Sequence, residues 1–387
     1  MNNKQKNIGV ITKPISKAGV VPLSNLLEII SYFSNNTYVI TGNEGLSLLP
    51  KNNSSIHIFG INQKFKTNMF AKIINHIYMQ LQLSYKILKL SKEVDCWIFF
   101  MDSHALLLPV LSAKMLRKKI IFALAASITK SLQATKKTID KVLIYSENIN
   151  YKLSDQIVLY SPNLIKDWNL TKYQKKISVA HEHFLNFNIF TDQNNYSERE
   201  YLIGYVGRLS EEKGILNLVK AIPEIIKWNM KIKFLIIGDG ILRKEVYSYL
   251  VENNLEKYVT IVGWVPHNDL PLYFNKLKLL ILPSYSEGLP NVMIEAMACG
   301  TPVLSTSVGS VPGIIIDGYT GFLMENNSPS CISKNIRRVF SYGNLNSISK
   351  NSVNFVVNNF SFETAVENYK YVVMGKEKCF GFNKNNY

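Results

Sequence analysis

Short apolar runs alternate with longer amphipathic stretches along the first half of the chain. These runs predict strands at 7–12, 37–41, 55–59, 96–101, 119–123, 141–145 and 156–159. The stretches between them predict helices at 24–33, 64–92, 106–116 and 130–139. Strands that alternate with helices form a parallel sheet with crossover helices, so this half predicts an α/β domain.

The second half repeats the pattern more clearly. It predicts strands at 201–206, 233–237, 259–263 and 279–282, and helices at 214–228, 242–252, 270–275 and 290–298. Between the halves, the polar stretch 192–200 (DQNNYSERE) has no period and predicts a linker. A chain of 387 residues exceeds what one core usually supports, so we expect two doubly wound domains, residues 1–191 and 192–360.

Composition narrows the class of protein. Four cysteines, at 96, 299, 331 and 379, are too few and too scattered for a disulfide framework or a zinc site, and they fit a reducing cytosol. The first seven residues are polar, which argues against a signal peptide, and we find no uncharged apolar run of about 18 residues. We therefore expect a cytoplasmic protein.

The positive charge is concentrated in the first half. Of the net charge of +16, residues 1–190 carry +14, from 24 Lys and Arg against 10 Asp and Glu. Within 64–92 six lysines occur without an acid, beside apolar residues near helical spacing. This segment is either a helix at an anionic membrane surface or an ordinary amphipathic helix with a solvated basic face. No aromatic and basic motif of a nucleic-acid-binding module occurs, so we do not expect nucleic acid as a partner.

Two acids flank the start of the predicted helix at 290–298. Glu287 lies in the loop after the strand, and Glu295 lies about one turn into the helix. Eight positions at about 1.5 Å rise span roughly 12 Å, the length of a nucleotide sugar. The backbone N–H groups from Gly288 to Asn291 favour a phosphate, and each carboxylate suits sugar hydroxyls. Pro290 suits the first turn, because its missing N–H removes no helical hydrogen bond.

Two cations follow the first strand of the second domain. Arg208 and Lys213 lie between this strand and its helix, where they could neutralise a pyrophosphate and stabilise a leaving group. Gly238 and Gly240 follow the next strand and allow close approach, although Gly-Asp-Gly is also a common turn.

Both segments resemble glycosyltransferase family 4, the retaining enzymes of GT-B fold, in which two Rossmann-like domains face each other across a cleft. The block SEGLPNVMIEAMACGTP is similar to the E-x7-E signature of that family, and GRLSEEKG to its G-R-L-x-x-x-K-G element. The resemblance implies that Arg208 and Lys213 bind the donor diphosphate, Glu287 the transferred sugar and Glu295 the ribose, without a metal or another cofactor. It also implies that the segment 361–387 begins with a helix that returns to the first domain. The donor-binding residues it suggests are Arg208, Lys213, Gly238, Gly240, Val265, Gly288, Leu289, Pro290, Asn291 and Glu295.

The first domain departs from the family pattern. A glycine pair is usual after the first strand, but only Gly19 is present, and the usual histidine is replaced in ALAASIT at 123–129. His104 as a catalytic residue and His183 on the acceptor side are the remaining candidates, since a histidine at a strand end could orient an acceptor. His181 and His183 could suggest a metal, but no third ligand is apparent in the sequence.

The activity expected from these features is transfer of a sugar from a nucleotide sugar to a lipid-linked or surface glycan, at the cytoplasmic face of the membrane. Two alternatives stay open. One is a sugar-nucleotide epimerase on the same two-domain plan, and the other is a non-catalytic subunit that binds a nucleotide sugar for another transferase.

Overall fold

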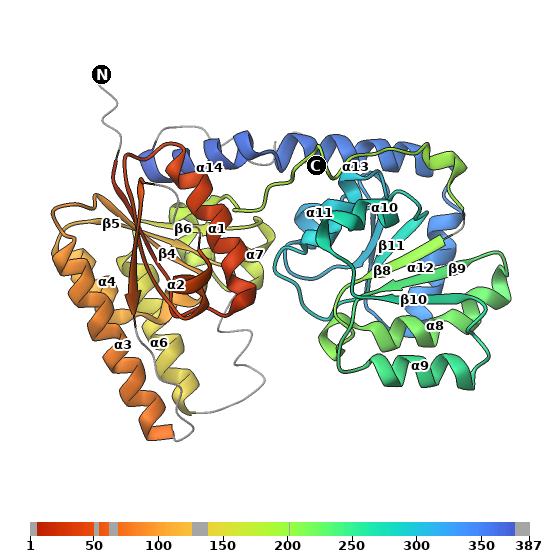
Figure 1. Cartoon of the computed structure of the whole chain (residues 1–387), viewed down its shortest axis with the longest axis horizontal. Helices are drawn as coiled ribbons and strands as arrows, with labels where there is room; N and C mark the ends of the chain where they lie inside the picture. Colours follow the sequence, from red (N-terminus) through yellow and green to blue (C-terminus); the bar gives the residue numbers. More distant parts are fainter. Residues whose placement is uncertain (1–5, 50–53, 62–68, 126–137, 201, 376–387) are drawn as a thin grey trace. The chain divides into compact units, whose positions relative to one another are not determined.

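The computed structural model describes residues 6–49, 54–61, 69–125, 138–200 and 202–375. The chain divides into two compact units (Figure 1). Unit 1 comprises Met1–Phe184 and Phe362–Tyr387, and unit 2 comprises Leu185–Ser361. The sequence placed this division after residue 191. Within the described ranges, no helix is both long and apolar enough to cross a bilayer.

Unit 1 is a seven-stranded parallel sheet in the order β3-β2-β1-β4-β5-β6-β7. Its strands are β1 (Ile8–Ile11), β2 (Thr37–Gly42), β3 (Ile56–Ile61), β4 (Cys96–Phe100), β5 (Lys119–Ala123), β6 (Gln156–Leu159) and β7 (Ile177–Val179). Helices flank the sheet (Figure 1). They are α1 (Lys17–Ser31), α2 (Glu44–Leu48), α3 (Met69–Lys89), α4 (Leu107–Met115), α6 (Thr138–Leu153), α7 (Asn163–Asp167) and α14 (Phe362–Met374), with 3-10 helices Met101–Ala105 and Thr171–Lys176. The central strands are apolar at every position, as expected of a sheet covered on both faces.

Unit 2 is a six-stranded parallel sheet in the order β10-β9-β8-β11-β12-β13. Its strands are β8 (Leu202–Val206), β9 (Lys233–Ile237), β10 (Val259–Gly263), β11 (Leu279–Leu282), β12 (Val303–Thr306) and β13 (Phe322–Met324). Its helices are α8 (Ile215–Trp228), α9 (Arg243–Glu252), α10 (Leu270–Phe274), α11 (Asn291–Ala298), α12 (Pro329–Phe340) and α13 (Leu345–Asn359). Short 3-10 helices span Tyr196–Glu198, Glu211–Lys213, His267–Asp269 and Val311–Gly313. The predicted doubly wound plan of two parallel sheets is confirmed.

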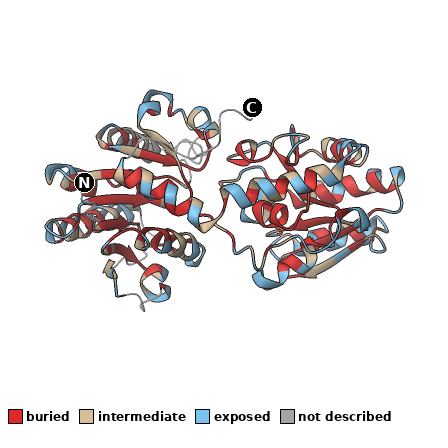
Figure 2. Cartoon of the chain, turned by 90° about the horizontal axis from the view of Figure 1, so that it is seen from above, coloured by how far each residue is buried: buried red, intermediate tan, exposed pale blue. Residues whose placement is uncertain are grey.

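The cores follow the apolar pattern. Figure 2 shows buried strands inside helices whose outer faces are exposed. In α8 the apolar stripe at positions 215, 218, 219, 222 and 226 packs into the core of unit 2, as its helical spacing predicts. In unit 1, α14 packs against α1, and Tyr369, Val372 and Val373 join the core formed by β1 and β4.

The predicted strand at 141–145 is wrong, because these residues lie inside α6. A short apolar run does not distinguish a strand from part of a helix. Glu147 is buried, and so are Asn150 and Tyr151, three and four residues later, which is the period of a helix. Because these buried side chains are polar, the sequence does not show this period. The helix expected at 130–139 lies mostly outside the described residues, and the expected helix at 24–33 begins earlier, at Lys17.

The polar stretch predicted to be a linker instead belongs to unit 2. Arg199 is buried, and its guanidinium donates to the carboxylate of Asp192 at 2.9 Å, to the hydroxyl of Thr301 at 2.9 Å and to the carbonyl of Cys299 at 2.8 Å. A buried arginine with this many partners fixes the start of the unit. Composition alone could not reveal it, because Thr301 and Cys299 lie about 100 residues away in the sequence.

Candidate functional site

The strand order of unit 2 reverses direction between β8 and β11. The chain runs from β8 outward to β9 and β10, and then returns to β11 on the other side of β8. In open parallel sheets, ligands bind beyond the carboxyl ends of the strands at such a switch point. Arg208 and Lys213 follow β8, and Glu287 follows β11, so the topology brings these predicted residues to adjoining strand ends.

Lys213 and Glu287 form an ion pair. The ammonium Nζ of Lys213 lies 2.7 Å from Oε1 and 2.9 Å from Oε2 of Glu287. The hydroxyl of Ser284 also donates to Oε1, at 2.6 Å. The side chain of Glu287 is only 8% exposed and that of Lys213 is 25% exposed, so the pair is partly buried. These three hydrogen bonds orient the carboxylate.

A glycine sets the close approach of the two loops. Gly214 follows Lys213 with a φ of 67°, in the left-handed region that favours glycine. A Cβ atom there would lie 2.0 Å from the carbonyl oxygen of Pro283, in the loop after β11. Gly214 therefore allows the loop that carries Lys213 to pack against the loop that carries Glu287.

Arg208 lies nearby but has a different partner. Its side chain is 74% exposed, and the guanidinium lies 3.3 Å from the carboxylate of Glu212. Its backbone is held more firmly, because the buried Tyr205 hydroxyl donates to the Arg208 carbonyl at 2.6 Å. Burial, and then the negative charge of Glu287, raise the pKa of Tyr205, so this phenol remains a donor. The loop is thus fixed while the guanidinium stays accessible.

Glu295 pairs with His267, a residue that sequence reasoning missed. Nε2 of His267 lies 2.8 Å from Oε1 of Glu295, whose side chain is 6% exposed, whereas that of His267 is 62% exposed. The hydrogen bond to Glu295 raises the pKa of His267, against the opposing effect of burial. The ring of Phe190 packs beside the imidazole, with centroids 5.1 Å apart. The signal in the sequence that could have indicated His267 is its position, two residues after the predicted donor-binding residue Val265 in the loop after β10.

The two glycines after β9 have a packing explanation. A Cβ on Gly238, whose φ is 128°, would lie 1.9 Å from the carbonyl oxygen of Gly207. A Cβ on Gly240 would lie 2.4 Å from the carbonyl oxygen of Leu209. Both therefore let the loop after β9 lie directly against the loop that carries Arg208. Val265, in the next loop, is half-buried.

The start of α11 differs slightly from the prediction. Pro290 is the residue before the helix, with an extended ψ of 111°, and Asn291 is the first helical residue, so Pro290 does not lie in the first turn. Leu289 is buried, and the carbonyl of Gly288 accepts from the N–H of Ser310 at 3.0 Å. The loop before α11 is thus anchored to the segment after β12.

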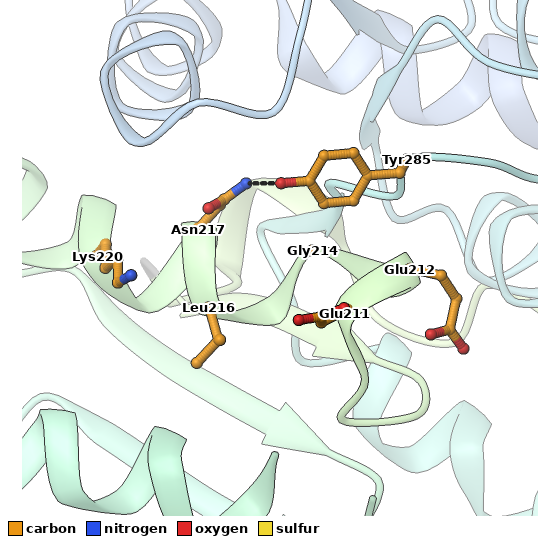
Figure 3. Close-up of a pocket in the computed structure, with 7 residues that line it drawn as sticks. All are labelled: Glu211, Glu212, Gly214, Leu216, Asn217, Lys220 and Tyr285. Carbon is orange, nitrogen blue, oxygen red and sulfur yellow. Dashed lines mark hydrogen bonds between the residues drawn. The ribbon is translucent and has the colours of Figure 1, made fainter. Parts of the chain in front are cut away.

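A cavity of about 570 Å³ opens between the start of α8 and the loop after β11 (Figure 3). The amide of Asn217 donates to the hydroxyl of Tyr285 at 2.9 Å across it. Its walls come from Glu211, Glu212, Gly214, Leu216, Asn217, Lys220 and Tyr285. The predicted site residues Arg208, Lys213, Glu287 and Glu295 do not line this cavity. Two lining residues, Gly214 and Tyr285, belong to the loops that carry Lys213 and Glu287.

The candidates of unit 1 are placed as follows. Gly19 lies in the first turn of α1, after β1, and is buried. His104 belongs to the 3-10 helix after β4, and its side chain lies outside the described part of the molecule. His183 is buried, with Nε2 at 3.5 Å from the carboxylate of Glu182, which also accepts from the Tyr160 hydroxyl at 2.6 Å.

The neighbouring His181 is fully buried in the same cluster. Burial lowers the pKa of His181 to about 3, and its Nδ1 lies 2.9 Å from the His183 carbonyl oxygen. The imidazole is therefore neutral at physiological pH. In the part of the chain that the structure describes, no three His, Cys, Asp or Glu side chains are grouped to hold a metal ion. The absence of a metal from the reaction stays a prediction.

Sequence comparisons connect this site to a known family. Residues 186–353 match the family described as glycosyl transferases group 1. An uncharacterized glycosyltransferase of Methanocaldococcus jannaschii is 37% identical over 142 residues, 36% of this chain and 39% of the relative. The capsular polysaccharide biosynthesis glycosyltransferase CapM of Staphylococcus aureus is 26% identical over 57% of each chain. An Escherichia coli UDP-Gal:alpha-D-GlcNAc-diphosphoundecaprenol alpha-1,3-galactosyltransferase is 31% identical over 44% of each chain. The matches thus span about two fifths to three fifths of these relatives.

Solved structures match almost the whole chain. Anabaena HepE in complex with UDP aligns with a TM-score of 0.74 over 95% of this chain and 100% of that one, at 15% identity. Sucrose-phosphate synthase from Thermosynechococcus elongatus aligns with a TM-score of 0.71 over 96% of this chain and 100% of that one, at 16% identity. These likenesses confirm the predicted GT-B fold. The segment 186–353, which is less than half of the chain and carries the Lys213–Glu287 pair, is similar to the glycosyl transferases group 1 family.

Proposed function

We propose that this chain is a retaining glycosyltransferase of family 4 that transfers a sugar from a nucleotide sugar to a lipid-linked or cell-surface glycan, without a metal ion. The observation that carries this proposal is the Lys213–Glu287 pair at adjoining strand ends. It sets a cation suited to a phosphate beside a carboxylate suited to sugar hydroxyls.

Lys213 would contact both the sugar-binding acid and the donor diphosphate. An ammonium has three N–H donors, and the two hydrogen bonds to Glu287 leave one for a phosphate oxygen. The exposed guanidinium of Arg208 would bind the diphosphate from the same loop. Two cations at the leaving group neutralise charge as the glycosidic bond breaks, which is the role a metal has in other transferases.

Glu287 and Glu295 would hold the two ends of the donor. Ser284 and Lys213 fix the Glu287 carboxylate, so it can accept hydrogen bonds from the transferred sugar in one orientation. One oxygen of Glu295 is bonded to His267, and the other would accept from the ribose hydroxyls. The N-terminus of α11, between the two acids, favours the diphosphate through its N–H groups.

Retention of configuration would follow from attack on the face of the departing group. The bond between the anomeric carbon and the diphosphate oxygen breaks, and the acceptor oxygen bonds to the same face of that carbon. The departing diphosphate takes the proton of the acceptor hydroxyl. No protein base is then required, which is consistent with the replacement of the usual histidine in the stretch 123–129 of the first domain.

The class of acceptor is inferred from relatives. The name of the Escherichia coli relative gives a diphosphoundecaprenol-linked sugar as its acceptor, and HepE was crystallised with UDP. A lipid-linked acceptor would place this chain in the cytoplasm, at the inner face of the membrane, with the basic first unit as the contact with anionic lipid.

The test is transfer by the purified full chain. Wild type is incubated with UDP- and GDP-sugars and diphosphoundecaprenol-linked N-acetylglucosamine, and the lipid product is analysed by mass spectrometry. We expect a product with wild type, and a rate lower by a factor of about 100 or more with Glu287→Ala. The control is Glu252→Ala, which removes an exposed acid from α9.

Two results would contradict the proposal. If the chain converts donor to an epimer without an acceptor, the epimerase is favoured. If it binds donor but transfers no sugar to any tested acceptor, the non-catalytic subunit is favoured. Wild-type rates in Glu287→Ala would remove the role given to that acid.

A further inference from the structure

Helix α3 exposes an apolar face. Eight large apolar or aromatic side chains on this helix are between 42% and 79% exposed: Phe70, Ile73, Ile74, Ile77, Tyr78, Leu81, Tyr85 and Leu88. Most recur three or four residues apart, so they lie on one side of the helix. Contiguous apolar surface of this kind on a monomer marks an interaction site.

The opposite side of α3 anchors the helix to unit 1. Met79, Leu83 and Ile87 are buried, and α3 packs along α4. The side chain of Gln80 accepts from the backbone N–H of Leu108 at the start of α4, at 3.0 Å. The apolar face is therefore held in place on a packed helix, as expected of a surface prepared for a partner.

The charged residues of this helix are all basic. Within α3, Lys72, Lys86 and Lys89 are the charged residues, and the helix contains no acid. The neighbouring α4 exposes Met115, at 84%, together with Lys114 and the following Arg117. The exposed side of α3 is mainly apolar, which favours a helix at a membrane surface over an ordinary amphipathic helix with a solvated basic face.

Lipid fits this combination better than a protein partner does. Apolar and aromatic side chains that project from a basic helix can enter the acyl boundary while lysines contact anionic headgroups. The aromatic residues Tyr78 and Tyr85 have polar tips that suit the headgroup level. The net charge of +14 on residues 1–190 adds electrostatic attraction to an anionic surface.

We propose that α3 is a membrane-docking helix that inserts its exposed apolar side into an anionic bilayer surface, with its lysines on phospholipid phosphates. Membrane docking by α3 deepens the proposed function and rests on it, because a lipid-linked acceptor lies at a membrane surface. Docking would bring the chain to its acceptor by adsorption to the membrane.

The experiment is vesicle flotation with the full chain. Vesicles of phosphatidylcholine alone are compared with vesicles of equal parts phosphatidylcholine and phosphatidylglycerol, at low and at high salt. We expect wild type to float with the anionic vesicles and Leu81→Glu/Tyr85→Glu to bind them at least about tenfold more weakly. Binding should fall with salt, because the lysine contribution is screened.

A matched control lies on α9 of unit 2. Tyr247→Glu/Val251→Glu also replaces one tyrosine and one aliphatic residue four positions apart, with exposed fractions of 57% and 41% against 66% and 53% for Tyr85 and Leu81. This control should float like wild type. Melting temperatures of both double variants show that they are folded.

Several outcomes would overturn the proposal. They are equal flotation of wild type and Leu81→Glu/Tyr85→Glu, no flotation of wild type with either vesicle, and a wild-type dimer that the α3 variant converts to monomer. The proposed function is tested separately, because the α3 variant should keep the wild-type rise in melting temperature with a nucleoside diphosphate. If wild type floats with anionic vesicles but its melting temperature does not rise with a nucleoside diphosphate, the proposed function alone is contradicted.

Discussion

Replacing Lys213 with methionine should destabilise unit 2 before any ligand is added. The change removes the ammonium but keeps most of the apolar stem of the side chain. The carboxylate of Glu287, which is 8% exposed, would keep the hydrogen bond from the Ser284 hydroxyl but lose both hydrogen bonds from the ammonium. An acid that is mostly buried and has lost its cation is costly, because its charge is no longer compensated.

The size of the effect follows from the burial of the pair. Fully exposed pairs contribute about 0–1 kcal/mol, and removal of one partner from a fully buried pair costs about 3–5 kcal/mol. With Lys213 25% exposed, the pair lies between these limits, and we expect a loss of about 2 kcal/mol in the free energy of unfolding. For a unit of this size, that corresponds to a melting temperature about 4–8 °C lower.

The assay is a double-mutant cycle in urea, with Lys213→Met, Glu287→Gln and the combined variant. Glu287→Gln removes the buried charge, so the combined variant should recover more than half of the loss caused by Lys213→Met. Lys227→Met, at an exposed lysine in the last turn of α8, controls for loss of positive charge. A coupling free energy near zero would refute the interpretation of this pair as a partly buried, mutually dependent unit.

Three further predictions concern the neighbouring residues. Arg208→Ala should change the unfolding free energy by less than about 0.5 kcal/mol, because the side chain is 74% exposed, yet raise the Kd for a nucleoside diphosphate about tenfold in calorimetry. The raised pKa of His267 means that its pairing with Glu295 stabilises the fold fully below the ordinary histidine pKa and loses that contribution as pH rises through the raised pKa. Thermal unfolding should therefore show His267→Gln less stable than wild type near about pH 6, and this deficit should shrink by about pH 8.5; a deficit independent of pH would contradict it. Gly238→Ala should destabilise unit 2 by about 3 kcal/mol or more in urea unfolding, because its Cβ would lie 1.9 Å from the carbonyl oxygen of Gly207 at a φ of 128°, and wild-type stability would contradict the geometry.

The sequence predicted the second unit better than the first for a physical reason. In α8 and the strands around it, apolar residues occur at clean helical or strand spacing, so period and burial coincide. In α6, buried polar side chains such as Glu147 and Asn150 hide the period, so the apolar run 141–145 predicts a strand where the structure has a helix. Local pattern cannot reveal burial that depends on partners distant in sequence, and Arg199 is the clearest instance.

The candidate site shows the same limit. Motif spacing brought Lys213 and Glu287 to adjoining strand ends, and the structure joins them directly. The spacing could not show that Glu295 has a histidine partner, because His267 is 28 positions away and lies in another loop. It also gave Gly238 a role near the ligand, which stays a prediction, and the contact of Gly238 with Gly207 is a second reason why this position carries no side chain.

The measurement that tests the central claim most directly is hydrogen–deuterium exchange of the full chain with and without a saturating nucleoside diphosphate, chosen from UDP, GDP and ADP by the largest rise in melting temperature. If the diphosphate binds between the cations after β8 and the N-terminus of α11, amides at 207–214 and 288–292 should exchange more slowly, and Lys213→Met should need a higher concentration for the same protection. Protection confined to other segments, or unchanged exchange at 207–214 and 288–292 under saturation, would contradict the account.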